Sequence, residues 1–217
     1  MTPPHNLLVV ANVAAPVAAF TLIAQDLVAD GWQPPGVNGV SAWSHMFAEV
    51  WQELTGATPT LRMELRVFEL RQVVPPVGVL GFMRPAADAD LELVLAWYTD
   101  FQLDAHVNDP PPRAEAILRR IHEQSIFLWD DGEPVSLAAA GRRTQNGVSI
   151  GPVFTPLARR GRGYASACVA ALSQRLLDEG AAFCTLFTDL GNPTSNKIYQ
   201  QVGYRPVCDF SEMRFAL

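Results

Sequence analysis

An apolar stripe at helical spacing occupies the last third of the sequence. Its members, at i, i+3, i+4, i+7 and i+11, are Ala165, Cys168, Val169, Leu172 and Leu176. Residues with this spacing line one face of a helix, and a glycine such as Gly180 commonly ends one. The stripe therefore predicts a helix over 165–179 that packs against a sheet.

Apolar runs around this helix predict the other elements of the second half. Strands are expected over 77–83, 125–129, 134–141, 148–155 and 184–188, helices over 88–101, 113–124 and 193–202, and one or two closing strands over 204–217. Strands and helices that follow each other in this way predict an α/β (α+β) fold, with a mixed central sheet flanked by helices.

The first 75 residues carry a shorter pattern of the same kind. It predicts a strand over 7–13, a helix over 16–29, a link near 36–40, a helix over 41–55 and a strand over 61–73. The prolines Pro75 and Pro76 then resist both helix formation and strand pairing. They mark the predicted boundary between a smaller first domain, 1–75, and a second domain, 76–217.

The net charge and the length of the apolar runs limit the kinds of binding partner that are expected. The 217 residues carry a formal charge of −6. Nucleic acids and anionic membranes require an excess of Lys and Arg, so neither is an expected partner. No apolar run reaches the roughly 18 residues of a membrane span. A small molecule or a peptide is favoured instead.

The cysteines and histidines indicate the cellular compartment and whether a metal site is expected. Cys168, Cys184 and Cys208 show no C-x-x-C spacing and fall in segments predicted to be buried, while the four histidines are scattered. These features favour reduced core thiols over a disulfide, and reduced thiols indicate a cytoplasmic location. Because no ligand spacing occurs, no bound metal is expected.

A basic, glycine-containing turn separates the predicted strand 148–155 from the helix 165–179. It holds Arg159, Arg160, Gly161, Arg162 and Gly163. A glycine turn that opens a helix presents unpaired N–H groups and the positive end of the helix dipole, which bind phosphate. A solvated basic loop is the alternative interpretation. The turn lacks the third glycine of a dinucleotide fingerprint and the Gly-Lys-Ser/Thr of a Walker loop.

This turn resembles the signature of the Gcn5-related N-acetyltransferases (the GNAT family). The signature, Arg/Gln-x-x-Gly-x-Gly/Ala, is met by Arg160, Gly163 and Ala165. Residues 192–204 are similar to the second motif of that family, a short helix that carries Asn and Tyr before a Gly-aromatic pair. The likeness covers roughly residues 76–217 and implies the GNAT fold, with acetyl-coenzyme A as the cofactor.

The resemblance also implies which residues contact the cofactor. In the family, two neighbouring strands splay apart and pantetheine inserts between them, while the glycine turn receives the pyrophosphate. The implied contacts, largely through backbone groups, are Val153, Phe154, Thr155, Arg160, Gly161, Arg162, Gly163, Tyr164, Ala165 and Ser166. Asn192 or Asn196 would fix the pantetheine arm from the second side.

Tyr199 is the implied catalytic residue. Its hydroxyl would face the thioester sulfur and protonate the departing thiolate. A core tyrosine on a helix face is the alternative. The general base is not identified, because the strand 148–155 has no carboxylate where many family members carry a Glu. Asp104, His106 and Asp189 are candidates, although surface or capping roles explain each of them.

The implied function is the transfer of an acetyl group from acetyl-coenzyme A to a primary amine of a small molecule or protein, by direct attack. A non-catalytic acyl-coenzyme A-binding regulatory or scaffold module is the alternative, and such a module would not need the Tyr199 phenol. The acceptor is not identified, since its walls would come from loops near 100–112 and 141–148.

Residues 1–75 are interpreted as a degenerate, partial GNAT-like domain that binds no cofactor. Their elements repeat the order of those predicted over residues 148–217. The turn over 12–16, however, has neither glycine nor arginine, so backbone could not approach a phosphate there. Too few strands are present to close a core alone, which makes packing on the second domain, or a homodimer, an expectation.

Overall fold

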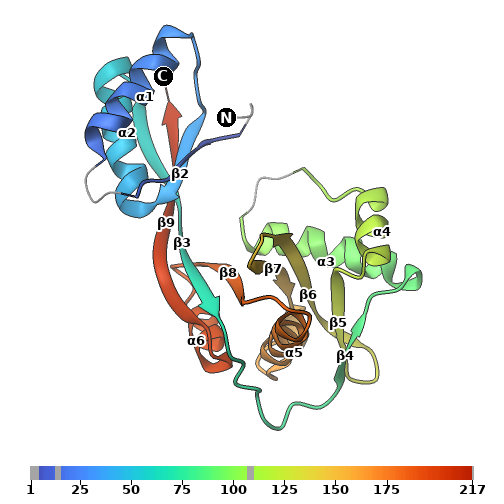
Figure 1. The fold of residues 1–217 in the computed structure, drawn as a ribbon. Coiled ribbons are helices and arrows are strands. Elements are labelled where there is room, and N and C mark those ends of the chain that lie inside the picture. Colours follow the sequence, from blue (N-terminus) through green and yellow to red (C-terminus); the bar gives the residue numbers. More distant parts are fainter. Residues whose placement is uncertain (1–4, 13–15, 107–109, 217) are drawn as a thin grey trace. The chain divides into compact units, whose positions relative to one another are not determined.

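A computed structural model of the chain describes residues 5–12, 16–106 and 110–216 (Figure 1). The chain forms two compact units. Unit 1 contains Met1–Val67, Thr188–Asn192 and Val207–Leu217, and unit 2 contains Phe68–Phe187 and Pro193–Pro206. The chain therefore begins in unit 1, builds most of unit 2, and returns to unit 1 for its last residues.

The units do not follow the predicted division at residue 75. The first passage of the chain through unit 1 ends at Val67, inside strand β3 (Thr58–Leu70), and the final strand β9 (Arg205–Ala216) contributes its later part to unit 1. That residues 1–75 are a degenerate GNAT-like domain stays a prediction.

Unit 1 is a small sheet with two helices on one face (Figure 1). Its elements are β1 (Leu7–Val9), α1 (Val17–Ala29), β2 (Gly36–Val40), α2 (Ser41–Thr55) and the parts of β3 and β9 named above. Strand β1 is parallel to β2, β2 is antiparallel to β9, and β9 lies next to β3. The predicted strand 7–13 ends at Val13, which lies outside the described residues, as does most of the turn that follows it.

Aromatic side chains hold this unit together. Phe47 of α2 packs against Phe20 of α1 and stacks on Trp51, which in turn stacks on Phe215 of β9. Phe20, Phe47 and Trp51 are buried. Burial of such side chains contributes about 2–3 kcal/mol each, so the last strand is part of the core of unit 1.

The link predicted near residues 36–40 is a strand, β2, so that prediction was wrong. In the sequence, its two glycines indicated a break in regular structure. In the structure, they allow close packing of neighbouring strands. A Cβ on Gly36 would lie 2.1 Å from the carbonyl oxygen of Met213, and a Cβ on Gly39 would lie 2.7 Å from that of Val9. Only glycine fits such approaches, so glycine here indicates a crowded strand.

Unit 2 contains a sheet with strands in the order β8-β7-β6-β5-β4. The elements are β4 (Phe82–Pro85), η1 (Asp88–Asp90), α3 (Leu91–Asp104), α4 (Ala114–His122), β5 (Ile126–Asp130), β6 (Pro134–Arg143), β7 (Gly147–Phe154), η2 (Leu157–Arg159), α5 (Tyr164–Asp178), β8 (Phe183–Asp189) and α6 (Pro193–Val202). Strands β4 to β7 are antiparallel, and β8 is parallel to β7.

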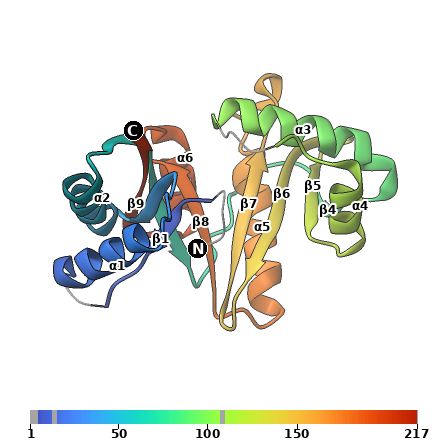
Figure 2. The same cartoon turned by 90° about the horizontal axis from the view of Figure 1, so that it is seen from above.

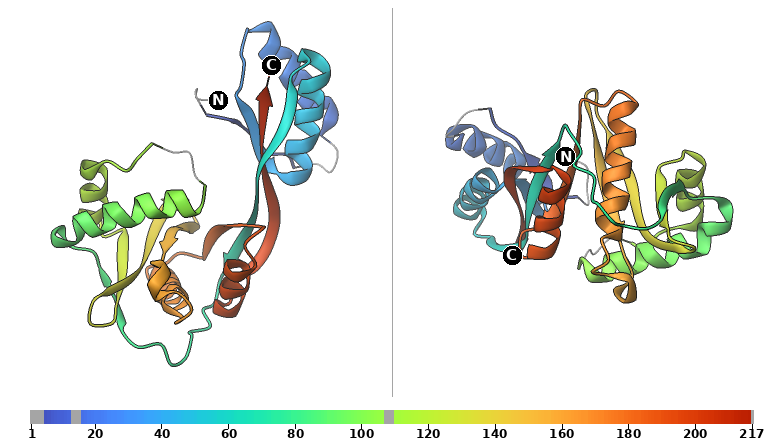
Figure 3. Two further views of the ribbon diagram at one scale, coloured as in Figure 1. Left: turned by 180° about the vertical axis from the view of Figure 1, so that it is seen from behind. Right: turned by 90° about the horizontal axis from the view of Figure 1, so that it is seen from below.

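Helices cover both faces of this sheet: α5 lies on one side and α3 on the other (Figure 2 and Figure 3, right). Strand β5 shows why. Phe127 and Trp129 belong to the core beneath α5, whereas Ile126 and Leu128 belong to the core beneath α3 and α4. A strand buried on both faces is a continuous apolar run rather than an alternating one. The predicted α/β architecture, a mixed sheet flanked by helices, is confirmed.

The predicted strand 77–83 was placed too early. The structure begins β4 at Phe82, and Val77 is 96% exposed. Gly78 and Gly81 both have positive φ (+79° and +103°), which breaks a strand at those positions. A Cβ on Gly81 would also lie 2.4 Å from the carbonyl oxygen of Asp130, so this glycine is needed where the chain approaches β5.

The three cysteines are free thiols. Cys168 and Cys184 are buried, as predicted, and Cys208 is half-buried on β9. Burial raises the pKa of the Cys168 thiol to about 12 and that of Cys184 to about 11. In the described ranges, no helix has both the length and the apolar character to cross a membrane.

Candidate cofactor site

The glycine turn lies between β7 and α5, as the sequence predicts. Gly161 and Gly163 both adopt the left-handed conformation, with φ of +79° and +82°. Gly163 is the N-terminal cap residue of α5. Beside it the space is narrow, since an added Cβ would lie 2.9 Å from Cγ2 of Val79. Only glycine adopts this geometry without strain.

The N-terminus of α5 is open to a ligand. The helix has no side-chain cap and no acidic residue in its first turn. Its first intrahelical bond runs from the Ala167 N–H to the Gly163 carbonyl oxygen (2.9 Å), so the N–H groups of Tyr164 to Ser166 lie ahead of the helical ladder. These groups, with the positive end of the 15-residue helix, suit phosphate oxygens.

The three arginines of the turn are not equivalent. Arg159 forms an ion pair with Glu133, and Arg160 forms one with Asp104 at the end of α3. The Arg160 Nε also donates to the Thr155 carbonyl oxygen at 2.9 Å. Within the part of the chain that the structure describes, the Arg162 side chain has no ion-pair or hydrogen-bond partner. Of the three positive charges predicted in the turn, two are therefore paired with carboxylates, and the Arg162 guanidinium is left without such a partner.

Several predicted cofactor residues have side chains committed to the protein interior. Phe154 packs against Trp97, with ring centroids 6.1 Å apart. The Thr155 hydroxyl lies 2.8 Å from the Ser136 hydroxyl, and the buried Tyr164 donates to Asp131 Oδ2 at 2.5 Å. These side chains are therefore not free for a ligand. The carbonyl oxygens of Phe154 and Thr155 also accept hydrogen bonds, from the Ser136 hydroxyl at 3.0 Å and from Arg160 Nε at 2.9 Å.

Strands β7 and β8 pair over a short stretch only. The paired residues run from Gly147 and Phe183 to Ser149 and Thr185. Beyond Ser149, β7 continues to Phe154 with β6 as its neighbour on the other edge. Among the described residues of unit 2, this half of β7 has an edge without a β8 partner. Unpaired backbone groups of that kind can receive an extended ligand as an added strand.

Tyr199 lies on α6 and packs against the core of unit 2. Its ring meets that of the buried Tyr204 edge-on, with centroids 6.0 Å apart. Burial raises the pKa of the Tyr199 phenol to about 12. Tyr204 is anchored by its hydroxyl, 2.8 Å from the Ser173 hydroxyl. The Tyr199 ring therefore packs against an anchored neighbour, and its phenol stays protonated throughout the neutral range.

The asparagines and the candidate bases occupy several positions. Asn196 is half-buried on α6, while Asn192 lies in the segment that belongs to unit 1. Asp189 Oδ1 accepts the Gly191 N–H at 2.8 Å, so the capping role expected for Asp189 is present. Asp104 is occupied by Arg160.

Sequence reasoning missed the hairpin between β5 and β6 as part of this region. Asp131 anchors Tyr164, the first residue of α5, and Glu133 pairs with Arg159. The acidic residues of this hairpin complement the basic turn, but the partners lie 33 and 26 residues apart, so no local sequence signal pairs them.

A family model matches about half of the chain. The model described as "Acetyltransferase (GNAT) family" matches residues 91–204, which include the glycine turn and α6. No curated protein matches the sequence.

Solved structures share the fold at low sequence identity. An acetyltransferase of the GNAT family from Colwellia psychrerythraea has 15% identity and a TM-score of 0.63, over 92% of this chain and 71% of that one. A GCN5-related N-acetyltransferase from Kribbella flavida has 21% identity and a TM-score of 0.59, over 93% and 75%. A ribosomal-protein-alanine N-acetyltransferase from Brucella melitensis has 18% identity and a TM-score of 0.53, over 63% and 99%. These likenesses show the fold alone.

Proposed function

Because this chain belongs to the GNAT acetyltransferase family, we propose that it transfers an acetyl group from acetyl-coenzyme A to a primary amine. The observation that carries the proposal is the open N-terminus of α5 behind two left-handed glycines. N–H groups of Gly161 to Ser166 would bind the pyrophosphate, with Arg162 as the neighbouring side-chain cation.

The unpaired half of β7 supports a path for the pantetheine arm. Val153 and Thr155 lie in or next to this half, beyond the last residue that pairs with β8. Their backbone groups would bond the pantetheine amides in the manner of an added strand. Asn196, or Asn192, would contact the arm from the second side.

When bound, acetyl-coenzyme A supplies an activated thioester. The chain then has to hold the acyl carbonyl, admit the amine and donate a proton to the leaving sulfur. Tyr199 fits the last task because its raised pKa keeps the phenol protonated at neutral pH. A pKa of about 12 lies above that of a thiol, near 8.5, so the phenol stabilises the sulfur chiefly by a hydrogen bond unless the bound thioester lowers its pKa.

Replacement of Tyr199 by phenylalanine tests the proposal. Tyr199→Phe keeps the ring against Tyr204 and removes the proton, so kcat should fall roughly 10²-fold with a nearly constant coenzyme A Kd. The measurement is thiol release from acetyl-coenzyme A over a panel of small amines and N-terminal peptides, with calorimetry for Kd. Tyr98→Phe is the matched control, since its buried hydroxyl lacks a hydrogen-bond partner in the described structure and turnover should not change.

The results also separate catalysis from binding alone. Equal turnover in Tyr199→Phe and the natural chain would remove Tyr199 from the mechanism. Tight coenzyme A binding with no turnover on any amine would favour the alternative, a non-catalytic acyl-coenzyme A-binding regulatory or scaffold module.

Arg162 gives a second, smaller test of the site. Arg162→Gln should weaken coenzyme A binding roughly tenfold, the loss expected for one charge-assisted hydrogen bond to phosphate. Arg159→Gln should change the Kd much less, because Glu133 already neutralises that guanidinium. Calorimetry at two salt concentrations distinguishes the two variants; equal losses would assign the effect to net charge instead of a contact.

The finer expectations from the sequence complete the proposal. We propose a soluble cytoplasmic enzyme whose acceptor is a small-molecule or peptide amine, and a homodimer as its assembly. The apolar residues exposed on unit 1, which are Leu8 on β1, Val10 directly after β1 and Leu22 on α1, support an intermolecular contact there. Light scattering at several concentrations tests the dimer.

A further inference from the structure

The hairpin of β5 and β6 contacts both ends of the glycine turn. Ser136, near the start of β6, contacts Thr155 directly after β7, and Asp131, in the hairpin loop, contacts Tyr164, the first residue of α5. Residues 156–163 lie between these two contacts and include both left-handed glycines. The part of the turn proposed to bind phosphate is therefore held at two points by one hairpin.

The contact at the start of the turn is buried. Ser136 is 0% exposed, and its hydroxyl donates to the Phe154 carbonyl oxygen at 3.0 Å. The same hydroxyl lies 2.8 Å from that of Thr155. Because a serine hydroxyl has one proton, Thr155 is the donor in this second bond and Ser136 is the acceptor. Two hydrogen bonds therefore fix the end of β7 and the start of the turn against β6.

The contact at the end of the turn is a charge-assisted hydrogen bond. The Tyr164 hydroxyl donates to Asp131 Oδ2 at 2.5 Å, and the Tyr164 side chain is buried in the core beneath α5. A hydrogen bond from a hydroxyl to a carboxylate is about twice as strong as one between neutral groups. The hairpin loop is tight, since the Asp131 N–H donates to the Glu133 carbonyl oxygen at 3.0 Å across Gly132, which has φ of +81°. The carboxylate is therefore presented from a well-defined backbone.

The arginine ion pairs of the turn hold it less firmly than these two contacts do. The side chains of the Arg159–Glu133 pair are 38% and 58% exposed, and those of the Arg160–Asp104 pair are 45% and 51% exposed. Ion pairs as exposed as these are screened by water and salt, so they contribute little to the stability of one conformation. The hydroxyl contacts at the two ends therefore decide the geometry of the turn.

We propose that Ser136 and Asp131 are positioning residues for coenzyme A, an inference that rests on the function proposed above. Groups that bind a ligand together have to be held within about 0.5 Å of their productive positions. Gly161 and Gly163 give the turn more backbone freedom than other residues would, so its N–H groups converge only if its ends are fixed. Neither Ser136 nor Asp131 would touch the ligand; each acts through the turn residue that it holds.

Ser173 provides a matched control on the same helix. Its hydroxyl is 0% exposed, as is that of Ser136. It also bonds one carbonyl oxygen, that of Val169 at 2.7 Å, and one hydroxyl, that of Tyr204 at 2.8 Å. Replacing either serine by alanine therefore removes the same kind of buried contact, but only Ser136 contacts the turn.

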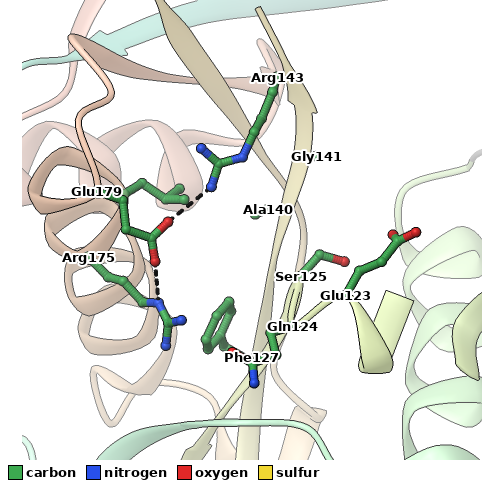
Figure 4. Close-up of a pocket in the computed structure, with 10 residues that line it drawn as sticks. Glu123, Gln124, Ser125, Phe127, Ala140, Gly141, Arg143, Arg175 and Glu179 are labelled. Atoms are coloured by element: carbon green, nitrogen blue, oxygen red, sulfur yellow. Dashed lines mark hydrogen bonds and ion pairs between the residues drawn. The ribbon is translucent and has the colours of Figure 1, made fainter. Parts of the chain in front are cut away.

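The opposite end of α5 provides a second control. There, Glu179 accepts hydrogen bonds from Arg175 Nε at 2.8 Å and from Arg143 Nη2 at 3.0 Å (Figure 4). Arg143 belongs to β6, so this ion pair joins the strand of Ser136 to the end of α5. Since a helix rises about 1.5 Å per residue, it lies roughly 20 Å from the glycine turn.

Calorimetry with coenzyme A and the full chain tests the two positions. Ser136→Ala and Tyr164→Phe should each weaken binding roughly tenfold, because the ligand then has to order the turn. Asp131→Asn keeps an acceptor oxygen for the Tyr164 hydroxyl and should weaken binding about threefold or less. Arg143→Gln and Ser173→Ala should bind as the natural chain does, although Ser173→Ala should lower the melting temperature as much as Ser136→Ala.

Hydrogen exchange measured by NMR in the chain without ligand reports on the turn itself. The N–H groups of Arg159, Arg160 and Ala167 donate to carbonyl oxygens within the turn. These amides should exchange about tenfold faster in Tyr164→Phe than in the natural chain, and at the natural rate in Ser173→Ala.

The two measurements distinguish failure of this inference from failure of the proposed function. If the natural chain does not bind coenzyme A, both are overturned. If it binds, equal losses of affinity in Ser136→Ala and Ser173→Ala, or an unchanged Kd in Tyr164→Phe, would overturn this inference alone. Unchanged exchange rates in Tyr164→Phe would do the same.

Discussion

Replacing Gly163 by valine is expected to abolish coenzyme A binding while the chain stays folded. The residue has φ of +82°, where a branched side chain costs at least 1–2 kcal/mol, and its Cβ would lie 2.9 Å from Val79 Cγ2. To relieve either the unfavourable φ or the clash with Val79, the backbone of the turn has to shift. N–H groups that must converge on one phosphate tolerate such a shift poorly, so the loss of affinity should exceed 10²-fold.

Gly180→Val is the matched control for this variant. Gly180 also has a positive φ (+99°), follows the other end of α5, and has open space where its Cβ would stand. Both variants should lower the melting temperature, but only Gly163→Val should lose coenzyme A binding in calorimetry. Retained affinity in Gly163→Val, or a similar loss in Gly180→Val, would contradict the assignment of the turn.

A chain that starts at Val77 is expected to fail to fold. The truncation removes Phe68 and Leu70, which are 0% and 1% exposed in the core of unit 2. Loss of each large core side chain costs about 2–5 kcal/mol, against a total stability of about 5–15 kcal/mol for a domain. In unit 1, β9 also loses its neighbours β2 and β3, leaving two open strand edges that favour aggregation.

Soluble yield and a thermal melt by circular dichroism measure this outcome. A second truncation that starts at Phe68 restores the two core side chains but not the neighbours of β9. It should recover part of the cooperative melt and little of the solubility. A soluble Val77 chain with a cooperative transition would show that residues 76–217 form an independent domain, as the sequence predicts.

Local signals account for what the sequence predicted well. The helix over 165–179 is α5, shifted by one residue, because a long apolar stripe with a glycine at each end has only one regular interpretation. The helix over 193–202 has the predicted bounds, and Gly203 follows it with φ of +109°. Proline at the start and glycine after the end specify that helix without reference to the rest of the fold.

The features that the sequence did not predict depend on contacts between residues far apart in the chain. Strand β2 was not predicted because its two glycines indicated a break in the chain. They are needed where the strand approaches the backbone of Val9 and Met213, and both of these residues are distant in sequence. The loss of free charge at Arg159 and Arg160 depends on Glu133 and Asp104, contributed by other elements. Glycine and arginine therefore located the turn that opens α5, while the number of arginines in it without an ion-pair partner could not be counted from the sequence.

The return of the chain to unit 1 has a consequence for folding during synthesis. Met213 and Phe215 of β9 belong to the aromatic and aliphatic core of a unit whose other strands lie in the first 67 residues. A ribosome makes roughly 5–20 residues per second, so about 7–30 seconds separate the first part of unit 1 from its last strand. During that interval, β2 presents an unpaired edge. Unit 2 can gather its helices and strands before unit 1 is complete, although unit 1 begins first.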